Sequence, residues 1–124
     1  MQPTPRKLTT LQIAVLIRVL REFPDQRVDL CYHPSATDAL GYAHDFLTVF
    51  KAIGWNVNRD APIEFVNSQV MGLAFVVSGQ GSLPPSAEAL RDTLRIYGIE
   101  VATLYDPAYN TESGGFILTI GPPA

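Results

Sequence analysis

The feature that most constrains the fold is the apolar run at residues 70–78, VMGLAFVVS, which precedes a turn with Gly79 and Gly81. The run is short, rich in β-branched and aromatic residues, and free of charged side chains. Strands that are buried on both faces of a sheet have this composition, because neither face meets water. The run therefore predicts an interior strand of a covered sheet.

A first strand–helix–strand module precedes this run. Residues 27–33 alternate in polarity, as expected of a strand, and Ser35 is a candidate cap for a helix at 36–53. Gly54 is a helix stop, and residues 55–58 read as a short strand. The order strand, helix, glycine, strand is that of a βαβ unit, so we expect its two strands to be parallel.

The second module repeats this order and starts with the 70–78 strand. Pro84 and Pro85 favour the entry to a helix at 86–97, and Gly98 leads into an alternating strand at 99–105. A further apolar strand follows at 116–120 without an intervening helix, so we expect it to pair antiparallel.

A helix at 8–23 precedes both modules, and residues 1–7 are expected to form a flexible tail. Thr9 and Gln12 fit a capping box. The apolar side chains of this helix cover an arc wider than the stripe of about 100° that burial on one side needs. Two interpretations remain open: the helix is wedged between a sheet and another helix, or its outer face is an oligomer interface or lies close to a membrane.

These elements predict the α/β class, with residues 8–124 as a single domain. We expect a mixed, mostly parallel sheet of about five strands with three helices, in which two βαβ units form a layered sandwich. Residues 63–66 are a candidate short edge strand.

The amino-acid composition limits the kinds of partner that the chain can bind. Charged residues make up 17% of the 124-residue chain, below the roughly 25% of typical soluble domains. This low charge and the wide apolar arc of the first helix predict a homodimer through that helix. The net charge of −3 argues against nucleic acid as a partner.

The residues with catalytic potential are few. Cys31 is the only cysteine, so no internal disulfide is possible, and the chain has neither a CxxC nor an HExxH pattern. We therefore predict no metal site and no cofactor. Cys31 and His33 share a strand face, which fits a nucleophile and a base, but the favoured interpretation is a buried structural cysteine beside a satisfied histidine. No residue is assigned a catalytic role.

The candidate ligand site is an anion site at the ends of two strands. Both the turn at 33–37 and the turn at 78–82 lead toward helix N-termini, whose free N–H groups attract anions. The alternative is structural, because the second turn lacks the lysine of a P-loop and the third glycine of a dinucleotide fingerprint. The candidate binding residues are His33, Ser35, Ser78, Gly79, Gln80, Gly81 and Ser82.

The order of landmarks resembles the soluble α/β domains of uncharacterised bacterial membrane proteins. The resemblance rests on Gly54-Trp55-Asn56-Val57, Gly72-Leu73, Pro84-Pro85, Gly98-Ile99-Glu100-Val101 and Gly121-Pro122. It implies a soluble module of a kind that is often tethered after transmembrane helices. No apolar run here is long enough to span a bilayer, which departs from that pattern and leaves either an excised domain or a free-standing relative. It implies no catalytic residues.

We therefore predict a non-catalytic ligand-binding, sensing or interaction module. Its expected location is cytoplasmic, at the inner face of the bacterial membrane if it is tethered. The alternative is a small nucleotide- or phosphate-binding enzyme that uses the turns at 33–37 and 78–82.

Overall fold

The computed structural model describes residues 5–57, 61–64, 71–77, 83–105 and 115–123. These residues form three α-helices and six β-strands, which confirms the α/β class. The elements in chain order are α1 (Thr10–Leu20), β1 (Arg27–Tyr32), α2 (Ala39–Ala52), β2 (Asn56–Val57), β3 (Ile63–Glu64), β4 (Leu73–Val77), α3 (Pro85–Ile96), β5 (Val101–Tyr105) and β6 (Phe116–Ile120).

The strands form one mixed sheet in the order β2-β1-β6-β4-β5. Strand β1 pairs in parallel with β2, β3 and β6, and β4 pairs in parallel with β5. The only antiparallel pairing among the described strands joins β4 to β6. Since β6 lies on one edge of β1, the short strands β2 and β3 share its other edge, at opposite ends of β1.

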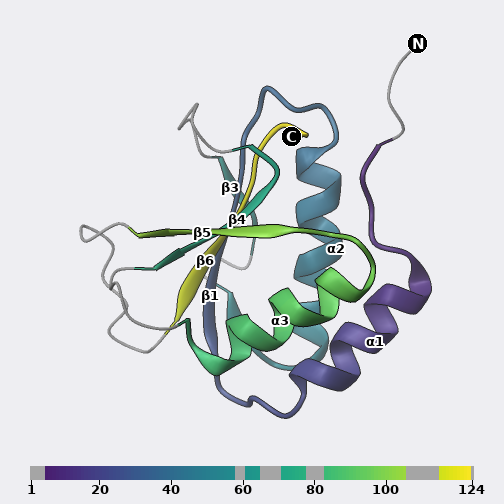
Figure 1. Cartoon of the computed structure of the whole chain (residues 1–124), viewed down its shortest axis with the longest axis vertical. Helices are drawn as coiled ribbons and strands as arrows, with labels where there is room; N and C mark the ends of the chain where they lie inside the picture. The colour runs from purple at the N-terminus through teal and green to yellow at the C-terminus, as the bar shows by residue number, and fades with distance from the viewer. Residues whose placement is uncertain (1–4, 58–60, 65–70, 78–82, 106–114, 124) are drawn as a thin grey trace.

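The two βαβ modules are β1-α2-β2 and β4-α3-β5. Their first strands run in opposite directions, and their second strands lie toward opposite edges of the sheet. Two right-handed crossovers arranged in this way place both helices on the same face. Figure 1 shows this arrangement, with the helices gathered on one side of the sheet.

Helix α1 begins with the predicted capping box, in which the Thr9 side chain accepts from the Gln12 N–H and the Gln12 side chain accepts from the Thr9 N–H. The helix packs against both α2 and α3, and Leu16 and Leu20 are fully buried there. Two helical neighbours account for much of the wide apolar arc, whereas the wedged interpretation expected one helix and the sheet.

Aromatic rings join the two modules inside the core. Trp55 stacks on Phe50 with ring centroids 5.2 Å apart and meets the edge of Phe116, which in turn contacts Phe75 at 5.2 Å. The Trp55 indole also donates a hydrogen bond to the Phe23 carbonyl at 2.8 Å. The row of rings therefore crosses the sheet from the first module to the second.

The sheet differs from expectation in the position of its last strand. Strand β6 does not pair with its chain neighbour β5. It lies between β1 and β4, antiparallel to β4 and parallel to β1. Strand β4, from the 70–78 run, is buried at all five positions and lies inside the sheet as predicted, one place from its centre.

The start of the second helix was predicted wrongly. Helix α2 begins at Ala39 rather than at residue 36, and its N-cap is Asp38, whose side chain makes no capping hydrogen bond. Ser35 does not cap it, because the Ser35 hydroxyl lies 2.7 Å from Nδ1 of His33 instead. The glycine stops were predicted correctly, since Gly54 and Gly98 adopt φ values of 77° and 76°.

Candidate functional site

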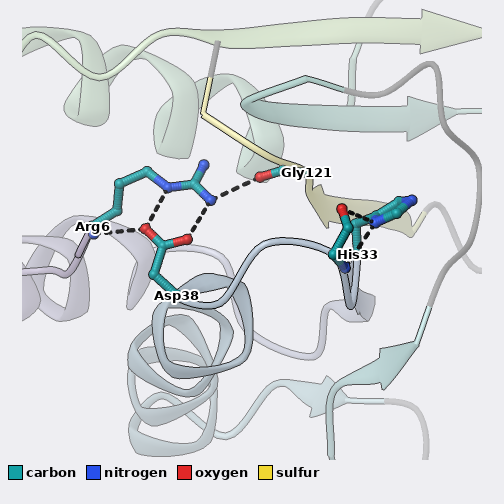
Figure 2. A network of polar contacts seen from close by, with 5 residues as sticks. Arg6, His33, Asp38 and Gly121 are labelled. Carbon is teal, nitrogen blue, oxygen red and sulfur yellow. Dashed lines mark hydrogen bonds and ion pairs between the residues drawn. The ribbon is translucent and has the colours of Figure 1, made fainter. Parts of the chain in front are cut away.

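A polar cluster ties the N-terminal segment to both the start of α2 and the end of β6. Arg6 donates to Asp38 from Nε at 3.0 Å and from Nη2 at 2.9 Å, and its backbone N–H donates to the same carboxylate at 2.8 Å. Nη2 also donates to the Gly121 carbonyl at 2.8 Å. Figure 2 shows Arg6 directed at these two partners. Arg6 belongs to the segment 1–7 that is expected to form a flexible tail, and these contacts hold both its side chain and its backbone N–H.

Arg6 sets the electrostatics of this cluster. The guanidinium hydrogen bonds lower the pKa of Asp38 from 3.8 to about 2, which keeps its carboxylate charged. The same guanidinium lies over the Tyr42 ring, 5.4 Å from its centroid. Burial raises the pKa of the Tyr42 hydroxyl. With its charge paired to Asp38, Arg6 is occupied as a structural anchor rather than presented to an anion.

The second polar group of this region is the pair His33 and Ser35, which directly follows β1. The Ser35 N–H donates to Nδ1 of His33 at 3.2 Å, and the Ser35 hydroxyl lies 2.7 Å from the same nitrogen. Because Nδ1 accepts from an N–H, the proton of the neutral ring is on Nε2. The backbone N–H of His33 donates to the Ile120 carbonyl at 2.8 Å, which anchors the turn to β6.

The described structure brings together only part of the predicted anion site. His33 and Ser35 are in contact, whereas residues 78–82 lie outside the described residues. Strand β4 runs antiparallel to β6, so Leu73 lies beside Ile120 and Val76 beside Ile117. The end of β4 is therefore at the opposite end of the sheet from His33. The described strand ends do not converge on one composite site.

Cys31 is buried on the helix-free face of the sheet. Burial raises the pKa of its thiol from 9.0 to about 11, and the nearby Asp29 contributes in the same direction. Within the described residues, the hydrogen bonds of the His33 ring go to Ser35 and none goes to the Cys31 sulfur. This geometry favours the structural interpretation of Cys31 over that of a nucleophile.

Beside Cys31, the helix-free face carries small side chains. The register places Cys31 next to Thr119, Thr119 next to Ala74, and Ala74 next to Ala102, so the four residues form one row across the sheet. Thr119 is fully buried, and its hydroxyl has no hydrogen-bond partner among the described residues. Within the described residues, no three His, Cys, Asp or Glu side chains are grouped to hold a metal ion.

Large apolar side chains are exposed at several further places, which include Leu40 and Met71 as well as two pairs of residues. Leu104 and Tyr105 on β5 are 40% and 49% exposed. Leu11 in the first turn of α1 is 66% exposed, and Ile96 in the last turn of α3 is 80% exposed. Helices α1 and α3 contact each other and run in opposite directions (Figure 1), so these two turns lie at the same end of the helical layer.

The sequence did not reveal the role of Arg6, nor did it reveal that Leu104, Tyr105, Leu11 and Ile96 are exposed. Arg6 and Asp38 are 32 positions apart, and no local pattern links them. The exposure of Leu104 depends on the place of β5 in the sheet, which only the topology gives.

None of the described helices combines the length and the hydropathy needed to cross a membrane. Comparison of the chain with known protein families, with curated proteins and with solved structures finds no match.

Proposed function

We propose that this chain is a non-catalytic binding module that works through protein–protein contacts. The observation that carries the proposal is the exposure of large apolar side chains, from 80% for Ile96 to 40% for Leu104, on a domain that already has a full core. Contiguous exposed apolar surface is typical of interaction sites, and Leu11 and Ile96 lie at the same end of the helical layer.

The polar side chains that could take part in a reaction also support a non-catalytic function. The Asp38 carboxylate is held by Arg6, and Nδ1 of His33 accepts from Ser35. The thiol of Cys31 is buried, and its pKa is about 11, so the thiolate needed for nucleophilic attack is scarce at neutral pH. Each group is occupied in a way that stabilises the fold.

The experiment that tests the proposal is a binding assay with matched variants of the purified chain, used as bait at several salt concentrations. We expect a stoichiometric partner that is lost when Leu11 and Ile96 are both changed to Ser, or when Leu104 is changed to Lys. Ser35→Ala is the control, and we expect it to retain the partner. Retention by every apolar variant, with loss in Ser35→Ala, would contradict the proposal.

A second candidate function is a small enzyme or phosphate-binding protein centred on His33 and Ser35. The observation in its favour is the 2.7 Å separation between the Ser35 hydroxyl and Nδ1 of His33, which is short enough for proton transfer. Against it stands the lack of any described carboxylate bonded to the His33 ring.

A thermal-shift screen with inorganic phosphate, nucleotides and sugar phosphates separates the two functions. We expect no stabilisation by any of them. Stabilisation that disappears in both His33→Ala and Ser35→Ala would support the second function and contradict the first. Hydrolysis of an activated ester tests for catalysis directly. Turnover that depends on Ser35 would also support the second function and contradict the first.

The resemblance to soluble domains of bacterial membrane proteins adds that the module works beside a membrane, in the cytoplasm, tethered by chain outside this sequence. Fractionation of cells that express the full reading frame tests this part. We expect the domain in the membrane fraction, released by detergent and not by salt.

A further inference from the structure

The two edges of the sheet are built differently. One edge is divided between the two-residue strands β2 and β3, with Pro62 before β3 and the exposed side chains Asn56 and Glu64 on them. Short strands, proline and polar side chains are the usual protection of a sheet edge against pairing with another chain.

The other edge, β5, has none of these protections. Its five residues, Val101–Tyr105, are uncharged, contain no proline, and pair in unbroken register with β4. Strand β5 pairs with no other described strand. Its side chains Ala102, Leu104 and Tyr105 are exposed, and within the described part of the chain no strand covers its outer edge. An uncharged open edge of this kind offers its outer N–H and C=O groups to another strand.

We propose that β5 pairs with β5 of a second copy of this chain, so that two sheets join into one across a two-fold axis. Two identical edges related by such an axis run antiparallel, and each supplies the donors and acceptors that the other needs. The absence of charge within Val101–Tyr105 matters here, because self-pairing of a charged strand would bring like charges together.

This inference rests on the proposed function and names the partner of one of its exposed surfaces, strand β5. It differs from the dimer through the first helix that the sequence predicts, since the apolar arc of α1 is largely occupied by α2 and α3. Both interfaces contain one exposed leucine, Leu104 in β5 and Leu11 in α1. The same substitution at these two positions therefore discriminates between them.

The test is sedimentation equilibrium of the whole chain from low micromolar to millimolar concentration, for the wild type, Leu104→Lys and Leu11→Lys. We expect a wild-type dimer that Leu104→Lys weakens by about tenfold or more in Kd, because lysine on an edge strand opposes pairing. Leu11→Lys is expected to dimerise like the wild type. Ala102→Lys, at an exposed position of the same strand, replaces Leu104→Lys if that variant does not fold.

Hydrogen exchange of the backbone amides supplies a readout specific to strand pairing. We expect the outward amides of residues 101–105 to exchange more slowly as the concentration rises in the wild type, and not in Leu104→Lys. A chain that remains monomeric at millimolar concentration overturns the inference. So does a dimer broken by Leu11→Lys alone, or one whose β5 amides gain no protection.

These outcomes are separable from those of the proposed function. A monomeric chain that still captures a partner through its apolar side chains refutes the dimer and leaves the function standing. A dimer whose Ser35 is needed for ester turnover refutes the non-catalytic function and leaves the interface standing.

Discussion

The Arg6 guanidinium donates two parallel hydrogen bonds to the Asp38 carboxylate, from Nε to Oδ2 at 3.0 Å and from Nη2 to Oδ1 at 2.9 Å. The two side chains are 21% and 12% exposed, so water screens the pair only in part. Bidentate charged pairs of this kind are stronger and more directional than ordinary surface ion pairs. This contact fixes the chain just before α1.

Replacing Arg6 with Ala should lower the free energy of unfolding by about 2 kcal/mol, because Asp38 and the Gly121 carbonyl then lose their donor. Urea denaturation measures the change. The neighbouring exposed Lys7 is the matched control, and Lys7→Ala should stay within about 0.5 kcal/mol of the wild type. Equal effects of both substitutions would mean that the anchor contributes nothing.

Acid should weaken the fold through Asp38. Its pKa is about 2 in the folded chain and 3.8 in its ordinary state, so the unfolded chain binds this proton more tightly. The contribution of Asp38 to the free energy of unfolding is therefore complete above about pH 4 and is lost as the pH falls through about 2. This contribution is at most about 2 kcal/mol. Denaturant titrations at a series of pH values measure it. Asp38→Asn should flatten this part of the profile, and an unchanged profile would exclude Asp38 as the cause.

Two glycines should respond in opposite directions to the same substitution. A Cβ on Gly115 would collide with the Arg27 carbonyl oxygen, so Gly115→Ala should cost about 2 kcal/mol or more. Gly41 lies exposed within α2 with open space around it, so Gly41→Ala should stabilise the chain by about 0.5–1 kcal/mol. Thermal unfolding of both variants checks the pair. A melting temperature that rises in Gly115→Ala would contradict the close approach of β6 to β1.

Cys31 should be slow to react with thiol reagents in the native chain. A rise in pKa from 9.0 to about 11 reduces the thiolate fraction about 100-fold at neutral pH, and burial limits access further. The rate of labelling by a maleimide in buffer, compared with the rate in concentrated urea, measures this. Native labelling as fast as in urea would show that the thiol is accessible.

The sequence predicted the local structure well because local structure depends on neighbouring residues. The capping box of Thr9 and Gln12, the stops at Gly54 and Gly98, and proline at the start of α3 each involve residues within one helical turn. The burial of β4 was predictable from its composition alone.

Features that depend on distant residues were not predictable. One local feature was not predictable either, because the Ser35 hydroxyl could cap a helix or approach His33, and the two choices have similar local signals. The Arg6 anchor depends on Asp38 and Gly121, which are 32 and 115 positions away. Whether the turns at the ends of β1 and β4 meet depends on the direction of β4, and that direction is set by its pairing with β6.

The position of β6 has a consequence for the order in which the chain can fold during synthesis. It is the last of the described strands, yet it alone joins β1 to β4. Until residues 116–120 leave the ribosome, each half can complete its own strand–helix–strand unit, but no ladder connects the halves. The nascent chain therefore exposes the inner edges of β1 and β4 together, and a chaperone has its greatest opportunity to act in that interval.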